Sequence, residues 1–147
     1  MTTAQLLLAL GSGIALLMGV GHGVLTLVDT IRPRYFTPVD DSVRIAMDGA
    51  RRIRMQGRWP VGASSNVWRL WLGFNLSHSL GVIVPSGTVL AIALLHFQTF
   101  AESWAVKASV LVVTVAYLVT SIRFWFSAPT LGLSIVLGCF VGAAILA

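Results

Sequence analysis

The sequence predicts an all-α fold, a transmembrane four-helix bundle with a short amphipathic helix between the first two spans. The chain of 147 residues is 56% hydrophobic and only 10% charged, whereas an ordinary soluble domain carries about 25% charged residues. Four long apolar segments cover approximately residues 3–28, 67–95, 104–122 and 128–147. Each is close to the ~20 residues that a helix needs to cross a bilayer. We therefore expect one integral membrane domain, residues 1–147.

The arginines predict the orientation in the membrane. Eight of the ten basic residues lie between positions 32 and 69, and cytoplasmic loops carry an excess of Lys and Arg. The pattern therefore places the loop 29–66 in the cytoplasm and both termini outside, in a bacterial cytoplasmic membrane. We interpret the clustered charge as contact with anionic lipids and not as a nucleic-acid site. The arginines expected to make this contact are Arg44, Arg51, Arg52, Arg54 and Arg58.

The cytoplasmic loop contains the signals of a helix start. Thr37 suits the N-cap, Pro38 the first helical position and Asp40 the first turn. Apolar residues then recur at helical spacing, at Val39, Val43, Ala46, Ala50 and Ile53. We expect an amphipathic helix lying on the inner leaflet.

Small residues predict how the spans pack. The first span carries Gly11, Ala15, Gly19 and Gly23 at every fourth position, and the fourth span carries Ser134, Gly138 and Gly142. Lipid supplies little hydrophobic drive for helix association, so small residues instead allow backbones to approach closely. The stripes predict packing faces and carry no information about function.

Polar residues within the spans are the candidate functional residues, because such residues are costly in a membrane. They fall on three spans and, from their distance to the flanking charged residues, at a similar depth near the cytoplasmic side. We expect them to form one ligand-binding or polar cluster, with Asp29 either as a member or as a solvated carboxylate near Arg32. The cluster consists of His22, Thr26, Asp29, Asn75, Ser77, His78, Tyr117 and Thr120.

Three interpretations of this cluster remain open. The histidines and Asn75 could bridge helices by hydrogen bonds that fix their register. They could line a pocket for a lipid headgroup or a quinone-like ring, with a histidine as acid or base. His22 and His78 could also ligate a haem iron, although we predict no cofactor and no metal site. The single cysteine, Cys139, excludes an internal disulfide and a CxxC pair.

One motif of the second span resembles the signature of a small group of bacterial four-span membrane proteins without an assigned activity. The motif is W-x-x-W-x-G-F-N-x-S-H-S-x-G, from Trp68 to Gly81. The Gly21-His22-Gly23 segment and the Pro38 to Met47 region also look similar. The resemblance implies the four-span fold, directs attention to Asn75 and His78, and implies no reaction.

The expected function is that of a small polytopic membrane protein that binds a lipid-like ligand or a membrane partner, as an accessory subunit. The alternative is a membrane enzyme that acts on a lipid or isoprenoid by histidine acid/base chemistry, and we lean toward the non-enzymatic function. Expected partners are membrane lipids and either a second copy of the chain or a larger membrane complex. The clustered arginines and apolar spans do not predict nucleic-acid binding.

Overall fold

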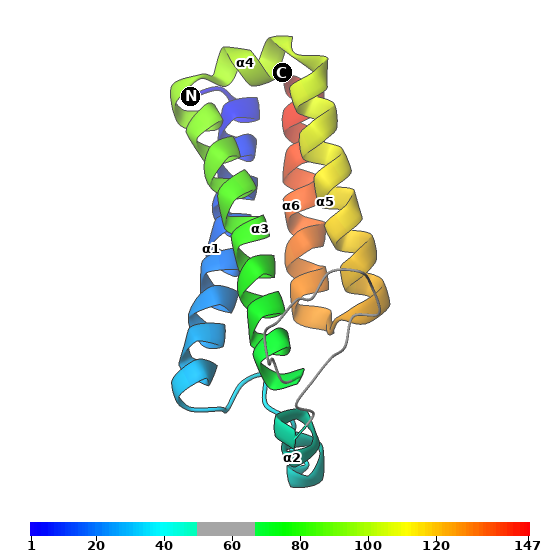
Figure 1. Ribbon diagram of the computed structural model, residues 1–147. Helices are drawn as coiled ribbons and strands as arrows, with labels where there is room; N and C mark the ends of the chain where they lie inside the picture. The colour runs from blue at the N-terminus through cyan, green and yellow to red at the C-terminus, as the bar shows by residue number, and fades with distance from the viewer. Residues whose placement is uncertain (50–66) are drawn as a thin grey trace, which may run out of the picture. The chain divides into compact units, whose positions relative to one another are not determined.

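The computed structural model describes residues 1–49 and 67–147, and every regular element among them is an α-helix (Figure 1). The four long helices are α1 (Thr3–Ile31), α3 (Val67–Leu95), α5 (Trp104–Phe124) and α6 (Ser127–Leu146), and the two short ones are α2 (Asp41–Gly49) and α4 (Phe97–Glu102). All four long helices are long and apolar enough to cross a membrane. The protein is thus a membrane protein with the predicted all-α fold.

The chain forms two compact units. Unit 1 comprises Met1–Val20 and Gly81–Ala147, and unit 2 comprises Gly21–Leu80. The helices α1 and α3 each contribute one part to each unit, whereas α4, α5 and α6 belong to unit 1 and α2 belongs to unit 2. The single domain predicted from the sequence stays a prediction.

Unit 1 is a bundle of four helix segments closed at one end by α4. Its core draws on α1, α3, α4 and α6, with partly buried residues of α5 packed against it; the buried members are Leu8, Ala15, Ala93, Phe100, Val136, Phe140 and Ala143. The sequence predicts only a connection at residues 96–104, but this segment contains α4, which buries Phe100. Both chain termini lie at this end of the unit (Figure 1).

The small residues of α1 pack as predicted. A Cβ on Gly19 would lie 3.0 Å from Ile83 Cγ1 and 3.2 Å from the backbone nitrogen of Ile83. A Cβ on Gly11 would lie 2.8 Å from Phe140 Cε1. The stripe on α6 is only partly confirmed, because Gly138 faces open space while Gly132, outside the predicted stripe, lies against Met18.

Unit 2 contains the ends of α1 and α3 and the segment between them. The helix α1 ends at Ile31, two residues before Pro33, which disfavours helical geometry at Arg32. The helix α2 begins at Asp41, so the predicted start with Thr37 as N-cap and Pro38 inside the helix is wrong. The part of the predicted helix at Ala50 and Ile53 lies outside the described residues.

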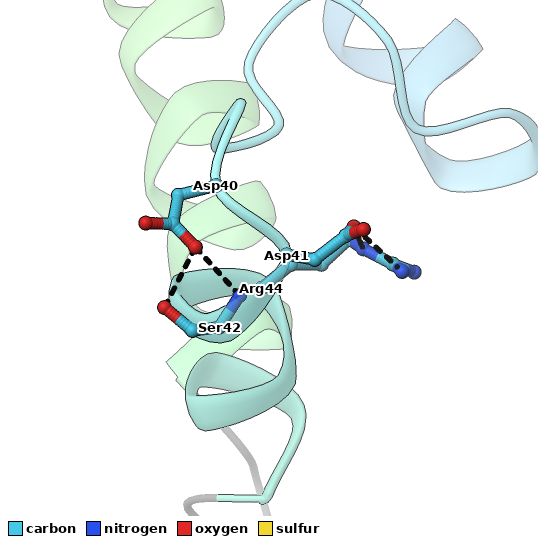
Figure 2. A network of polar contacts seen from close by, with 4 residues as sticks. All are labelled: Asp40, Asp41, Ser42 and Arg44. Atoms are coloured by element: carbon cyan, nitrogen blue, oxygen red, sulfur yellow. Dashed lines mark hydrogen bonds and ion pairs between the residues drawn. The ribbon is translucent and has the colours of Figure 1, made fainter.

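Asp40 is the N-cap of α2 in place of Thr37. Its Oδ1 accepts hydrogen bonds from Ser42 N at 2.8 Å and Ser42 Oγ at 2.6 Å (Figure 2). The carbonyl of Asp40 accepts a further bond from Arg44 N. An Asp side chain caps a helix at least as well as Thr, which agrees with a cap at Asp40 in place of Thr37. These bonds from Ser42 lower the pKa of the Asp40 carboxyl. Thr37 Oγ1 is instead buried without a hydrogen-bond partner among the described residues.

Candidate functional site

The predicted histidines meet in unit 2. His22 lies on α1, and Asn75 and His78 lie three residues apart on α3, which places their side chains on one face. His22 Nε2 is 3.0 Å from Asn75 Oδ1. The imidazole rings of His22 and His78 are 5.5 Å apart between centroids and meet edge to face. The structure therefore brings together the three residues that the sequence singles out most strongly.

Asn75 fixes the proton of His22. Its Nδ2 donates a hydrogen bond of 2.8 Å to the carbonyl of Trp71, one turn earlier in α3. This bond turns Oδ1 toward His22, and an amide oxygen can only accept. His22 Nε2 must therefore carry a hydrogen and donate it, so that Nδ1 holds the lone pair whenever the ring is neutral.

Aromatic rings surround the two histidines. The His22 ring packs 4.7 Å from the ring of Phe36, which precedes α2. On the other side, the ring of His78 stacks on Phe74 with a centroid distance of 6.1 Å. Trp71 Nε1 donates a hydrogen bond of 3.2 Å to the carbonyl of Phe36. The segment before α2 is thus folded onto both helices and covers the His22 ring.

Asp29 anchors this segment. Its side chain is 0% exposed, and its oxygens accept three backbone hydrogen bonds, from Arg34 N at 3.0 Å, Tyr35 N at 2.8 Å and Phe36 N at 2.6 Å. The interpretation of Asp29 as a solvated carboxylate near Arg32 is therefore wrong. A buried carboxylate requires strong donors, and the chain supplies main-chain amides that the spacing of side chains does not reveal.

Thr26 and Ser77 complete their hydrogen bonds within their own helices. The hydroxyl of Thr26 is buried and donates to the carbonyl of His22 at 2.9 Å. Ser77 is exposed and donates to the carbonyl of Phe74 at 2.9 Å. Two residues after Asn75, Ser77 points to another face of α3. Thr26 therefore belongs to the cluster only through its bond to the backbone carbonyl of His22, and Ser77 lies outside the cluster.

Tyr117 and Thr120 belong to unit 1. Thr120 is exposed and donates to the carbonyl of Ala116 within α5. Tyr117 lines a cavity of about 280 Å³ whose walls come from α1, α3, α5 and α6. Its hydroxyl oxygen lies 3.0 Å from the position that a Cβ on Gly81 would take. The histidines thus belong to unit 2, whereas Tyr117 lines a cavity of unit 1, and their membership of one cluster stays a prediction.

The cavity of unit 1 has a buried back wall and an exposed mouth. Ala15, Val136 and Phe140 form the back and belong to the core. Val84 of α3 and Val113 of α5 line the mouth and are 62% and 43% exposed. The lining is mainly apolar, with a few hydroxyls such as those of Ser109 and Thr114. The mouth opens on the surface of α3 and α5, two helices that are long and apolar enough to cross a membrane.

Sequence reasoning missed this cavity and the environment of Lys107. A cavity arises from the spacing between helices, and no residue pattern encodes that spacing. Lys107 gave a signal, because a lysine inside the first turn of a span is costly in a membrane. The positive-inside argument rests on the cluster of basic residues between positions 32 and 69, so it does not use that signal.

The basic loop is described only in part. Arg44 donates hydrogen bonds to Asp41 Oδ1 at 3.0 and 3.2 Å, and both side chains are exposed (Figure 2). An exposed pair of this kind contributes little to stability, so Arg44 can exchange Asp41 for a lipid phosphate at small cost. The other predicted lipid contacts, Arg51, Arg52, Arg54 and Arg58, lie outside the described residues.

The histidine pair does not offer a cavity for haem in this arrangement. A porphyrin between two axial histidines separates the rings, whereas the rings of His22 and His78 meet edge to face and His22 Nε2 is bonded to Asn75. Among the residues that the structure describes, no three His, Cys, Asp or Glu side chains are grouped to hold a metal ion.

Comparisons with protein families, with curated proteins and with solved structures gave no match.

Proposed function

We propose that the protein binds a lipid-like molecule within the membrane and that the cavity of unit 1 holds its apolar part. The observation that supports this most directly is the cavity itself, of about 280 Å³, with mainly apolar walls from four helices. That volume is close to the lower end of the range for small-ligand sites, about 300 Å³. Hydrocarbon is the occupant that mainly apolar walls favour, because it gains dispersion contacts without leaving polar groups unpaired.

The route of entry supports a ligand that arrives from the bilayer. Val84 and Val113 at the mouth are exposed on lipid-facing helices, while the back wall is closed by the core of unit 1. A molecule dissolved in the membrane can therefore enter between α3 and α5 without crossing water. The hydroxyls of Thr114 and Tyr117 would meet a polar group of the ligand inside the cavity.

The test fills the cavity. Ala15→Leu adds a side chain at the back wall, where Ala15 lines the cavity, and Ala91→Leu makes the same change at an exposed position of α3. We expect native mass spectrometry of the purified protein to show bound lipid in the wild type and in Ala91→Leu, and a loss of at least about tenfold in affinity for Ala15→Leu. Equal lipid binding by all three proteins would contradict the proposal. A co-purifying membrane protein in place of lipid would instead favour binding of a membrane partner, with the chain as an accessory subunit.

We also propose that the chain lies in a bacterial cytoplasmic membrane with both termini outside, as the positive-inside rule predicts. The test uses a Cys139→Ser background, which removes the single native cysteine. Val39→Cys, at a fully exposed position before α2, is expected to resist labelling from outside intact cells. Gln98→Cys in α4, on the other side of the span α3, is expected to label. The reverse pattern would invert the orientation.

The second candidate function is a membrane enzyme that uses the histidines of unit 2. The observation in its favour is that Asn75 orients His22, whose Nδ1 keeps a lone pair, beside the second imidazole of His78 at 5.5 Å between ring centroids. Such a pair could exchange a proton with a substrate. His78→Ala would then abolish turnover of a lipid substrate and leave the melting temperature in detergent unchanged. A lower melting temperature without any specific loss of turnover would favour the structural role.

A further inference from the structure

Lys107 is a buried cation without an anionic partner among the described residues. Its side chain is 7% exposed, and its Nζ lies 5.4 Å from the ring centroid of Trp104 and 5.8 Å from that of Phe100. Within residues 1–49 and 67–147, no carboxylate lies in ion-pair range of Nζ, and no oxygen accepts a hydrogen bond from it. An ammonium group carries three donors, so the ring faces satisfy its charge only in part.

The position of Lys107 in α5 adds to its positive potential. It is the fourth residue of the helix, in the first turn, where the helix dipole is positive and cations are unfavourable. The cap at this end does not offset the charge, because Ser103 Oγ accepts its hydrogen bond from the backbone N–H of Val106. The dipole and the ammonium therefore act together, and an anion placed here would be stabilised by both.

Lys107 shares a face of α5 with the cavity. Val110 and Thr114, which line the cavity, follow Lys107 by three and seven residues, and this spacing places all three on one side of a helix. The rise from Lys107 to Val110 is about 4.5 Å. Trp104, beside the ammonium, is 79% exposed, as expected of an aromatic residue at the level of lipid headgroups. A cation at headgroup level thus adjoins an apolar cavity below it.

We infer that the ligand of the cavity is an anionic phospholipid, with its phosphate bound to Lys107 and one acyl chain in the cavity. The inference rests on the proposed function, because it assigns a chemical class to the same ligand. Charge complementarity selects the phosphate, and the covalent link between phosphate and acyl chain matches the order of cation and cavity along α5. A free phosphate ion would leave the cavity empty.

The experiment compares two phospholipids that share their acyl chains and differ in their headgroup, one with a net negative charge and one zwitterionic. The full chain, in detergent, is titrated with phosphatidylglycerol and with phosphatidylcholine of identical acyl chains, and bound lipid is measured by native mass spectrometry. We expect a preference of about fivefold for phosphatidylglycerol, which is what a single lysine at a membrane surface confers. Lys107→Gln is expected to bind both lipids equally, and Lys107→Arg to keep the preference.

Arg123→Gln is the matched control. It removes one cation at the opposite end of α5, about 24 Å away along the helix, and should leave the preference unchanged. If Lys107→Gln retains the preference for phosphatidylglycerol, the lysine only packs against its rings and the inference is overturned, while binding in the cavity still stands. If the wild type binds neither lipid, or if Ala15→Leu binds both as the wild type does, the proposed function fails as well. Lys107→Gln should keep the wild-type affinity for phosphatidylcholine, which shows that this variant is folded.

Discussion

Each of the two units is stabilised internally by a different kind of interaction. Unit 1 relies on apolar packing around Leu8, Val136 and Phe140, with few hydrogen bonds between its segments, such as the one from Gln5 Nε2 to the carbonyl of Ala93 at 2.8 Å. Unit 2 relies on directional bonds between segments, at the His22–Asn75 contact and around Asp29. The difference has a structural consequence. Packing that depends on dispersion tolerates a cavity between helices, whereas bonds of about 3 Å require the segments to meet.

The largest expected effect is that of Asp29→Ala, which removes directional hydrogen bonds that stabilise unit 2. The change removes the buried carboxylate that accepts three backbone hydrogen bonds from residues 34–36. Hydrogen bonds to a charged group contribute about 1.5–3 kcal/mol each, but Arg34 and Tyr35 are exposed, so water can replace part of the loss. We therefore expect a loss of about 3 kcal/mol, measured by thermal or denaturant unfolding in detergent.

The control for this prediction is Thr30→Ala. Thr30 is the exposed neighbour of Asp29, and its hydroxyl donates only to the carbonyl of Leu27 within α1. It should melt near the wild type. If Asp29→Ala melted at the same temperature as Thr30→Ala, the three amide bonds would not stabilise unit 2.

Gly19→Ala tests the packing of unit 1. The new Cβ would meet Ile83 at 3.0 Å and its backbone nitrogen at 3.2 Å, and the backbone cannot rotate away as a side chain can. We expect a loss of about 1–3 kcal/mol from overpacking, measured by the same unfolding assay. Gly13→Ala is the matched control, because nothing lies within 4 Å of its Cβ position and alanine favours the helix by about 1 kcal/mol. Destabilisation by both variants alike would argue against close approach at Gly19.

Asn75→Ala removes the bond between α1 and α3 in unit 2. Hydrogen bonds between membrane helices contribute about 0.6 kcal/mol on average, so the loss should be smaller than for Asp29→Ala and detectable as a modest drop in melting temperature. Ser77→Ala, two residues later on an exposed face, removes only a bond to Phe74 in the same helix. An equal effect of the two variants would assign no stability to the His22–Asn75 bond.

The smallest expected effect is a pH dependence of α2. The bonds from Ser42 lower the pKa of Asp40 below its ordinary value of 3.8, so the folded helix favours the ionised carboxylate. Its contribution is complete above pH 3.8 and is lost as the pH falls through the lower folded pKa. Hydrogen exchange of the α2 amides should therefore show less protection at pH 2 than at pH 6, relative to amides of α6. The difference should disappear in Asp40→Asn, which caps without a titrating group.

Much of the fold follows from the composition of the sequence. The spans predicted at 67–95 and 104–122 correspond to α3 (Val67–Leu95) and α5 (Trp104–Phe124), because long apolar segments in lipid have helix as their one spanning solution. The start of α2 could not be predicted from Thr37 and Pro38 alone. Thr37 and Asp40 are both suitable N-cap residues. Asp40 is the cap because its side chain accepts a bond from Ser42, and this contact depends on the path of the chain.

The candidate site was predictable where the helical period alone determines it. Asn75 and His78 share a face by spacing. Similar depth makes a meeting with His22 possible, but the contact itself depends on how α1 and α3 are rotated, which the sequence does not give. Ser77 was included because it is polar, although its position two residues after Asn75 already turns it away. The amides that bind Asp29 and the cavity beside Tyr117 could not be predicted, since a main-chain donor and an empty volume leave no mark in a string of side chains.

The hydrogen bonds to Asp29 also determine at which neighbouring positions the amino acid can be replaced. The partners at positions 34–36 are peptide N–H groups, which every amino acid except proline possesses. Arg34, Tyr35 and Phe36 can therefore drift in side-chain identity without any loss at the carboxylate, while a second proline after Pro33 would delete a donor outright. In a set of diverged relatives, positions 34 and 35 should look variable beside an aspartate that does not change, while Phe36 is held by its contact with the His22 ring.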